Sequence, residues 1–230
     1  MPTMTSTHIP PYKRARGRPK KTEDERDDGN RRQALISAAA QLFKLKGYDA
    51  TSTREIASKV GMHAGSPFYH FENKQDLLLA VMVEGMTQAI ARQQRALDGL
   101  LVQGEHTPRA RLQVLVRHHF DVLLGPDSDF IPVMLYEGRS LNPAQVHTIT
   151  QLKDRYEAAW IPVLQTLHGN GDLRAPVSLA RLMIFGALNW SVQWYEAPNS
   201  SGQRRKGTAH ATLDDLTQAA LLLFLMPLTA

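Results

Sequence analysis

The chain of 230 residues contains no cysteine, which excludes disulfide bonds, thiolate catalysis and thiolate metal sites. Long apolar runs are also absent. The longest, Ala219–Leu225, is much shorter than the roughly 18 residues that a membrane-spanning helix needs. No apolar signal segment stands at the N-terminus. These absences predict a cytoplasmic protein without a membrane partner.

Motifs typical of catalysis are missing as well. The sequence has no Walker loop, no G-x-G-x-x-G and no G-x-S-x-G. His118 and His119 are adjacent and point to different faces of a helix, which argues against a shared metal ion. Asp127 and Asp129 are interpreted as caps of a helix start rather than as an acid/base pair. We therefore expect no enzyme, no metal site and no cofactor.

Charge is distributed unevenly along the chain. Residues 1–75 hold fourteen Lys and Arg against eight Asp and Glu, a net charge of +6. Residues 76–230 hold thirteen against fourteen, a net charge of −1. A basic N-terminal part on a nearly neutral body indicates a polyanionic partner at that end, and a solvated basic tail is the alternative.

Residues 1–29 are predicted to form a flexible basic arm. They are polar, contain four prolines and show no apolar periodicity. The segment KRARGRPKK, residues 13–21, carries six basic side chains, and its core Arg16-Gly17-Arg18-Pro19 resembles an AT-hook. In such a motif the arginines enter the narrow minor groove of A·T-rich DNA. A tail that only increases solubility is the alternative.

From residue 30 onward, apolar residues recur at helical spacing, with no strand alternation and no internal repeat. The chain is therefore predicted to be all-α, with about nine helices. Capping residues and proline at the first helical position indicate where helices begin. The predicted ranges are Asn30 to Gly47, Ser52 to Lys59, a short helix ending near Phe71, a longer helix after Asn73, Thr107 to Leu124, Asn142 to His168 with a kink at Pro162, Pro176 to Glu196, and Thr212 to Leu225.

The segment 52–71 has the pattern of a helix-turn-helix, whose second helix lies in the major groove of DNA. Gly61 is the candidate for the turn. The predicted small core consists of Ile56, Val60, Phe68 and Phe71. Small and polar residues occupy the remaining surface, where they can approach phosphates or base edges. A helical hairpin without a DNA-binding role is the alternative.

Residues 35–81 resemble the DNA-binding domain of the TetR (tetracycline repressor) family. The matching positions are Phe43, Gly47, Tyr48, Ile56, Ala57, Gly61, Gly65, Tyr69, Phe71, Lys74 and Leu77. The resemblance implies a DNA-binding domain at residues 30–75 that recognises a double-stranded operator, and a ligand-binding and dimerisation domain at residues 76–230. With the arm included, the predicted DNA-binding residues are Arg16, Arg18, Ser52, Thr53, Arg54, His63, Ala64, Gly65, Ser66, Phe68, Tyr69, His70 and Lys74.

Two residues depart from the usual pattern of the family. Phe68 stands where a tyrosine is common, which removes a hydrogen bond to phosphate. Pro67 stands where an aliphatic residue is usual. Because proline is favoured in the first helical turn, we expect Ser66 to be the N-cap and the recognition helix to be short.

The resemblance also implies a homodimer that pairs through the last two helices. Both predicted helices are more apolar around their circumference than a surface helix, although burial within one monomer is the alternative. The residues concerned are Leu179, Leu182, Met183, Phe185, Gly186 and Leu188 in the first helix and Leu213, Leu216, Ala220, Leu221 and Phe224 in the second. A two-fold dimer would match the two halves of a palindromic operator.

Aromatic and polar residues gather in the second half of the chain, as in a ligand pocket. The strings GALNWSVQWY (186–195), LYEGRSL (135–141) and RYEAAW (155–160) resemble a TetR subgroup with members that sense acyl-CoA thioesters. In that interpretation Arg139 and Arg155 would pair with phosphate or carboxylate groups. The predicted ligand-binding residues are Tyr136, Arg139, Arg155, Trp160, Phe185, Asn189, Trp190, Gln193 and Trp194.

The sequence thus predicts a ligand-responsive transcriptional regulator. Its simplest form is a repressor that a small hydrophobic or acyl-CoA-type effector releases from the operator. Two alternatives belong to other classes. One is a helical enzyme with a merely structural N-terminal hairpin, and the other is an architectural protein that binds DNA of many sequences through its basic arm.

Overall fold

The computed structural model describes residues 23–126, 128–196 and 211–227, and in these ranges it contains nine α-helices, three short 3-10 helices and no strand. The predicted all-α fold is confirmed. The helices are α1 (Glu23–Lys46), α2 (Thr53–Lys59), η1 (Ser66–Tyr69), α3 (Lys74–Val102), α4 (Pro108–Leu124), α5 (Phe130–Glu137), η2 (Gly138–Ser140), α6 (Pro143–Glu157), α7 (Ile161–Gly169), α8 (Val177–Trp190), η3 (Ser191–Gln193) and α9 (Leu213–Phe224). Within the described ranges, none of the helices combines the length and the hydropathy of a membrane span.

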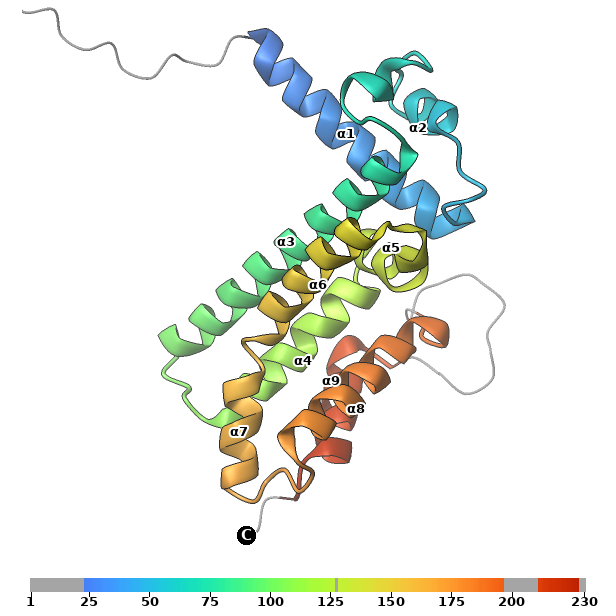
Figure 1. Cartoon of the computed structure of the whole chain (residues 1–230). Coiled ribbons are helices and arrows are strands. Elements are labelled where there is room, and N and C mark those ends of the chain that lie inside the picture. Colours follow the sequence, from blue (N-terminus) through green and yellow to red (C-terminus); the bar gives the residue numbers. More distant parts are fainter. Residues whose placement is uncertain (1–22, 127, 197–210, 228–230) are drawn as a thin grey trace, which may run out of the picture.

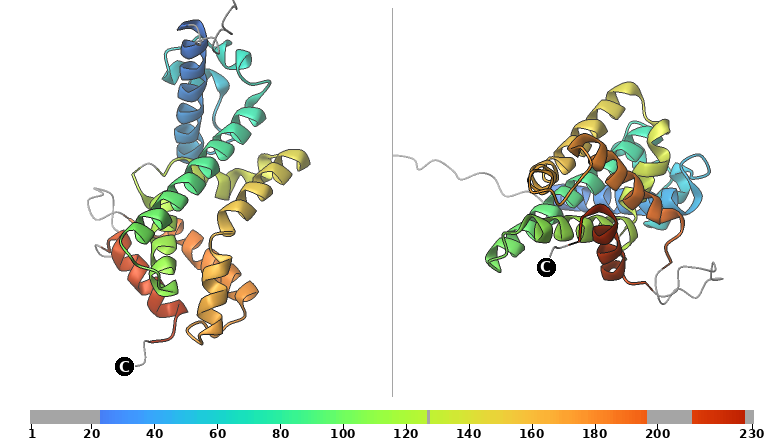
Figure 2. Two further views of the ribbon diagram at one scale, coloured as in Figure 1. Left: turned by 90° about the vertical axis from the view of Figure 1, so that its left-hand side faces the viewer. Right: turned by 90° about the horizontal axis from the view of Figure 1, so that it is seen from below.

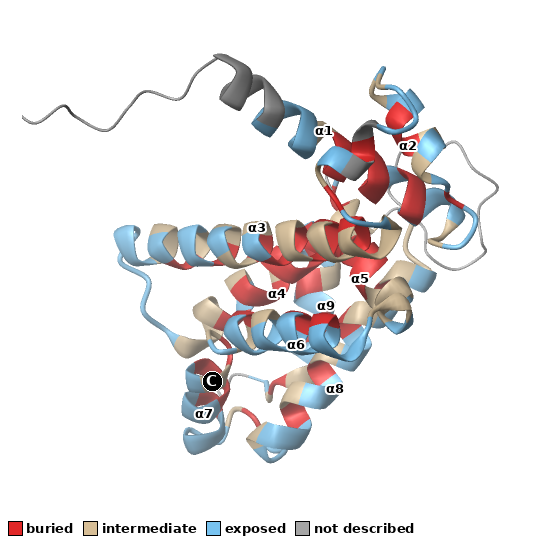
Figure 3. Cartoon of the chain, turned by 45° about the horizontal axis from the view of Figure 1, so that its top comes forward, coloured by how far each residue is buried: buried red, intermediate tan, exposed pale blue. Residues whose placement is uncertain are grey.

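The helices form an upper unit and a larger helical body (Figure 1). The upper unit consists of α1, α2 and η1, and the long helix α3 leads from it into the body, as the side view in Figure 2 shows. In the body, α4 is central, because it contacts α3, α5, α7, α8 and α9. Buried residues lie along the facing sides of α1, α3 and α4 (Figure 3). One continuous hydrophobic core therefore joins the two parts.

Five helices begin at a side-chain N-cap in the position that the sequence predicts. Ser52, Asn73, Thr107, Asn142 and Thr212 each accept a hydrogen bond from the backbone N–H three residues later, at 2.9–3.2 Å. Each bond satisfies one of the four N–H groups that a helix start leaves without a partner. The predicted starts of α2, α3, α4, α6 and α9 are confirmed.

Two predicted helix boundaries are wrong. Helix α1 begins at Glu23 rather than at Asn30, so Asn30 lies inside it and caps nothing. The predicted helix 142–168 is two helices, because α6 ends at Glu157 and Pro162 stands in the first turn of α7, where its missing N–H costs nothing.

The region before α5 and the end of α8 also differ from expectation. Asp129 occupies the N-cap position of α5 but makes no capping hydrogen bond, since its carboxylate pairs with Lys44 at 3.1 Å. Asp127 lies outside the described residues. Helix α8 ends at Trp190 and continues as η3 to Gln193, so it does not run to Glu196 as predicted.

Candidate DNA-binding face and ligand cavity

The helix-turn-helix is formed by α2 and η1. Gly61, with φ of +69°, takes the left-handed conformation that ends α2 and lets the chain turn. The recognition segment is a single 3-10 turn with Pro67 in its first turn, as the sequence predicts. Gly65, rather than Ser66, holds its N-cap position. The short segment therefore presents few side chains to a partner.

Most of the described residues predicted to bind DNA are exposed or half-buried on the upper unit. Tyr69 is 91% exposed, Thr53 and His70 are half-buried, and Arg54 is exposed. The turn residues His63, Ala64 and Gly65 are exposed as well. Of Ser66 and Phe68 only the backbone is described, and Arg16 and Arg18 lie outside the described residues.

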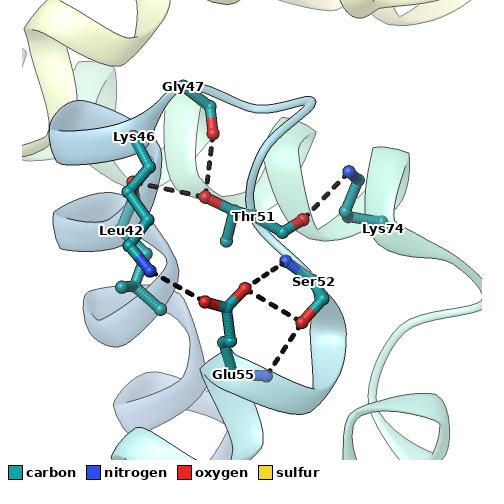
Figure 4. A network of polar contacts seen from close by, with 7 residues as sticks. All are labelled: Leu42, Lys46, Gly47, Thr51, Ser52, Glu55 and Lys74. Carbon is teal, nitrogen blue, oxygen red and sulfur yellow. Dashed lines mark hydrogen bonds and ion pairs between the residues drawn. The ribbon is translucent and has the colours of Figure 1, made fainter.

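Sequence reasoning missed Thr51 of the upper unit, which is buried at 1% exposure (Figure 4). Its Oγ1 donates to the carbonyl oxygen of Gly47 at 2.8 Å and lies 3.3 Å from that of Leu42, two carbonyls at the C-terminal end of α1. Its own carbonyl oxygen accepts a hydrogen bond from Lys74. Thr51 thus connects α1, α2 and α3, and its position directly before the N-cap was the signal available in the sequence.

Lys74 belongs to the same network. Its Nζ donates to the carbonyl oxygens of Tyr48 at 2.9 Å and Thr51 at 3.0 Å, and it stands 4.1 Å from the centre of the Tyr48 ring. These contacts fasten the start of α3 to the loop before α2. The structure therefore gives Lys74 a positioning role, and the contact with phosphate stays a prediction.

The start of α2 is closed by a reciprocal capping box (Figure 4). Ser52 Oγ accepts from the backbone N–H of Glu55 at 3.2 Å, and the Glu55 carboxylate accepts from the backbone N–H of Ser52 at 2.9 Å. Lys46 Nζ donates to the same carboxylate at 2.8 Å. The hydrogen bond from Lys46 and then those from Ser52 lower the pKa of Glu55 to about 2. Glu55 is therefore ionised whenever the protein is folded near neutral pH.

A cavity of about 170 Å³ lies in the body between α3, α4, α5, α6 and α8. Its walls are mainly apolar, and its polar groups come from α4, α6 and α8. The lining residues are Met86, Ala89, His119, Val122, Ile131, Met134, Leu135, Lys153, Tyr156, Glu157, Phe185 and Asn189. Sites for drug-sized ligands measure about 300–1,000 Å³, so this cavity fits an acyl-sized group rather than a whole nucleotide.

His119 connects the polar groups of the cavity. Its Nδ1 lies 3.1 Å from the Tyr156 hydroxyl oxygen, and its Nε2 lies 3.0 Å from Asn189 Oδ1. An amide oxygen only accepts, so Nε2 carries the hydrogen and the Tyr156 hydroxyl donates to Nδ1. Burial lowers the pKa of His119 to about 4, and the imidazole is therefore neutral at pH 7.

Of the predicted ligand-binding residues, the structure brings Phe185 and Asn189 to the cavity. Trp160 is fully buried behind it, with its ring centre 4.7 Å from that of Phe185. The remaining residues do not line the cavity, and they are Tyr136, Arg139, Arg155, Trp190, Gln193 and Trp194. Sequence reasoning missed His119 and Lys153, and it placed Tyr156 only within the string RYEAAW. The His118-His119 pair is visible in the sequence, but its spacing speaks only to a metal site and not to a ligand cavity.

Lowering the pH from 7 to 5 is expected to reduce the free energy of unfolding by about 2 kcal/mol through His119 alone. Its pKa is about 4 in the folded chain against an ordinary 6.5, so the unfolded chain takes up the proton first and stability falls as pH drops from 6.5 to 4. The lowered pKa of His118 acts in the same direction. Urea unfolding at both pH values measures the effect.

His119→Gln, which is neutral throughout, is the comparison for this prediction. The variant is expected to lose less stability than the wild type between pH 7 and 5. Glu55 and Asp215 also have lowered pKa values, but carboxylates with ordinary values of 4.5 and 3.8 act below this window. An identical pH dependence in the two proteins would contradict the assignment to His119.

Helix α5 joins the cavity to the upper unit. Its residues Ile131, Met134 and Leu135 line the cavity. Just before α5, Asp129 pairs with Lys44 at the end of α1. At its other end Glu137 Oε1 accepts a hydrogen bond from the backbone N–H of Tyr48 at 3.1 Å. A displacement of α5 would therefore act directly on the loop that carries α2.

A second set of contacts connects α3 with the body. Gln75 Nε2 donates to the carbonyl oxygen of Ser140 at 2.5 Å, and Gln145 Nε2 donates to Asp76 Oδ1 at 2.9 Å. Helix α3 also crosses α5 at Gly85, where a Cβ atom would stand 2.5 Å from Cβ of Phe130. The close crossing leaves no room for independent movement of α3 and α5.

Helices α8 and α9 contact each other and lie side by side in the body (Figure 1). Both expose large apolar side chains. The exposed residues are Leu179, Leu182, Met183, Trp190, Leu222 and Leu223, at 57–81% exposure. Phe185, Leu188, Ala220 and Leu221, by contrast, face the interior or are half-buried. An apolar face of this kind indicates an interaction surface. On α9 it is formed by residues other than those predicted.

Two family models match the sequence. Residues 35–81 match the model described as bacterial regulatory proteins, tetR family, and residues 105–203 match the tetracyclin repressor-like C-terminal domain. The fatty acid metabolism regulator protein of Bacillus subtilis (strain 168) is 27% identical over 160 residues, which cover 69% of this chain and 79% of that protein. The two models coincide with the helix-turn-helix and with the helical body.

Solved structures share the fold. The superantigen PfiT is 33% identical, with a TM-score of 0.67 over 84% of this chain and 95% of that chain. AibR in complex with isovaleryl coenzyme A and operator DNA is 22% identical, with a TM-score of 0.69 over 84% and 97%. FadR from Bacillus subtilis in complex with stearoyl-CoA is 24% identical, with a TM-score of 0.62 over 83% and 96%.

Proposed function

Since the chain belongs to the TetR family of bacterial regulatory proteins, we propose that it represses transcription as a homodimer and leaves its operator when an acyl-CoA-type effector binds. The family assignment agrees with the resemblance found in the sequence, and it makes the chain a DNA-binding transcriptional regulator rather than a helical enzyme. The observation that carries the proposal is α5, which lines the cavity and is joined to the upper unit by the contacts of Asp129 with Lys44 of α1 and of Glu137 with Tyr48 in the loop before α2.

The DNA-binding part of the proposal rests on the exposed residues of the upper unit. Arg54 and Thr53, at the start of α2, are proposed to meet phosphates and nearby bases, and Tyr69, at 91% exposure, is proposed to contact DNA from the recognition segment. The predicted boundary at residue 30 falls inside α1, so we assign this domain to residues 23–75 and the arm to residues 1–22. The arginines of the arm, Arg16 and Arg18, are proposed to enter the adjacent minor groove. Binding to chromosomal DNA would place the protein in the cytoplasm.

The dimer is proposed to form through the exposed apolar face of α8 and α9. A two-fold interface uses the same surface on both copies, and a helix pair from each copy would make a four-helix contact. Two recognition segments held in this way would reach successive major grooves, about 34–36 Å apart. This arrangement requires a palindromic operator.

The effector is proposed to be an acyl-CoA thioester with its acyl chain in the cavity. The apolar walls and the small volume suit a hydrocarbon chain. Proteins of the same fold are described in complex with isovaleryl coenzyme A and with stearoyl-CoA. Arg139 and Arg155 are exposed and outside the cavity, so they are candidates only for the parts of the effector that stay outside it.

Release is proposed to proceed through α5. An effector changes operator affinity only if it binds the two conformations with different affinities. A chain that fills the cavity presses on Ile131, Met134 and Leu135 of α5. That helix contacts Lys44 and Tyr48 of the upper unit and crosses α3 closely, so its displacement would change the distance between the two recognition segments.

Footprinting on the DNA upstream of the chain's own gene tests the proposed function, with and without octanoyl-CoA. We expect protection of one discrete palindromic site and its loss when octanoyl-CoA is added. Scattered protection that depends mainly on salt would instead favour an architectural DNA binder. An Arg54→Ala variant serves as the control, since it should lose the discrete site while keeping its fold.

A further inference from the structure

Asn189 offers an unused hydrogen-bond donor to the cavity. It lies in the last turn of α8, is half-buried and lines the cavity. Its Oδ1 accepts from Nε2 of His119 at 3.0 Å. Its Nδ2 has no hydrogen-bond partner among the described residues. A partly buried amide N–H without a partner favours a ligand that carries an acceptor.

A chain of hydrogen bonds fixes the orientation of this amide. The Tyr156 hydroxyl donates to Nδ1 of His119, which leaves Nε2–H to donate to Asn189 Oδ1. The imidazole is held between aromatic rings, with ring centres 5.2 Å from Phe185 and 5.9 Å from Trp160. Because the oxygen of the Asn189 amide is engaged by His119, only its NH₂ group is available to the cavity.

A second, buried amide, that of Gln93, contacts two residues near the cavity, Trp160 and Tyr156. Gln93 is 3% exposed, and in the orientation that gives each group a partner it accepts from Nε1 of Trp160 at 2.9 Å and donates to the carbonyl oxygen of Tyr156 at 3.1 Å. These bonds hold Trp160 and Tyr156 in place. The polar side of the cavity is therefore ordered before any ligand enters, which reduces the entropy cost of binding.

Charge at the cavity discriminates between possible acceptors. Among the described residues that line the cavity, Lys153 and Glu157 are the only lysine, arginine, aspartate or glutamate residues. Both lie on α6. Glu157 pairs with Arg181 of α8, and Lys153 is exposed. Buried His119 is neutral. A carboxylate next to Asn189 would thus lose its hydration without gaining a buried cation, whereas a neutral carbonyl oxygen needs only the N–H.

We propose that Asn189 donates a hydrogen bond to a neutral carbonyl oxygen of the effector and thereby selects a thioester over the corresponding free acid. His119 and Tyr156 are positioning residues that act through Asn189. Lys153 lines the cavity and is exposed, so it is the candidate partner for the anionic part of the effector. This inference rests on the proposed function, because it assigns one atom of the proposed acyl-CoA effector to one side chain.

Calorimetric titration of the full chain tests the inference with three probes: octanoyl-CoA, S-octyl-CoA, which lacks only the carbonyl oxygen, and octanoate. The wild type is expected to bind octanoyl-CoA about tenfold more tightly than S-octyl-CoA, which corresponds to one hydrogen bond to a partly buried amide. Octanoate is expected to bind more weakly than either thiol derivative. These affinity ratios are measured on the wild-type protein, so they do not depend on whether a variant folds.

Variants then distinguish the role of Asn189 from that of the positioning residue Tyr156. Asn189→Asp keeps an oxygen for His119 and removes the NH₂ group, and Asn189→Leu removes both. Each should bring the ratio between octanoyl-CoA and S-octyl-CoA close to one. Tyr156→Phe should lower the ratio while leaving the affinity for S-octyl-CoA unchanged, a result that a general loss of structure would not produce. Asn170→Asp, at the exposed end of α7, is the matched control and should keep the wild-type ratio.

Equal binding of octanoyl-CoA and S-octyl-CoA by the wild type would overturn the inference and leave the proposed function intact, provided that both release the operator. Tight binding of octanoate would overturn the preference for a neutral carbonyl. If no acyl-CoA of any chain length binds, the proposed function fails together with the inference. The two failures are therefore distinguishable.

Discussion

Leu182→Glu is expected to convert the protein into a monomer and to weaken operator binding by about 10²- to 10⁴-fold, the gain that two linked half-sites provide. Leu182 is 57% exposed in one chain and lies in the apolar face of α8, beside Met183 at 69%. The two-fold axis would place the new carboxylate in the interface twice, and burying an unpaired charge is costly.

Sedimentation equilibrium and operator gel shifts measure this effect together. Gln165→Glu introduces the same charge at an exposed position of α7 and should leave both the dimer and operator binding unchanged. Leu223→Glu, at an 81% exposed position of α9, should reproduce the effect of Leu182→Glu. A Leu182→Glu protein that remains a dimer would show that another surface forms the interface.

Ala89→Phe is expected to weaken effector binding at least 100-fold while changing operator affinity little. Ala89 is 2% exposed, lies on α3, and its side chain lines the cavity. A phenyl ring at this position would occupy the space proposed for the acyl chain, and each methylene excluded from the cavity forfeits about 0.8 kcal/mol. The variant should therefore repress permanently, because the effector no longer enters.

Titration with octanoyl-CoA and operator gel shifts check this prediction. Overpacking of a buried site costs about 1–3 kcal/mol, so thermal unfolding must accompany the binding data. Ala91→Phe, two residues further along α3 but exposed, is the matched control and should bind effector normally. Normal effector binding by Ala89→Phe would show that the cavity is not the effector site.

The sequence predicts the helix starts well because each depends on local chemistry. Ser52 and Thr212 cap their helices through side chains three residues from their partners, and such pairs are visible as short motifs. The break between α6 and α7, by contrast, has no short capping motif that would reveal it in the sequence. Apolar spacing continues across residues 158–160, and the proline at 162 suits either a kink or a new first turn.

The sites depend on tertiary contacts that periodicity does not contain. Apolar spacing identifies α8 as a helix with more than one apolar face, but only packing shows that Phe185 faces the cavity whereas Leu182 faces outward. The same holds for Lys74, whose ammonium meets carbonyls from a distant loop. His119 is recognisable as part of a ligand site only once α4, α6 and α8 bring Tyr156 and Asn189 to it.

The central claim is that the cavity and the helix-turn-helix are thermodynamically coupled, and a reciprocal binding measurement tests it most directly. Operator affinity is measured with and without saturating octanoyl-CoA, and octanoyl-CoA affinity is measured with and without operator DNA. Linkage requires that both affinities fall by the same factor, which we expect to be about 5- to 150-fold. Octanoyl-CoA that binds in the cavity and leaves operator affinity unchanged would contradict the account.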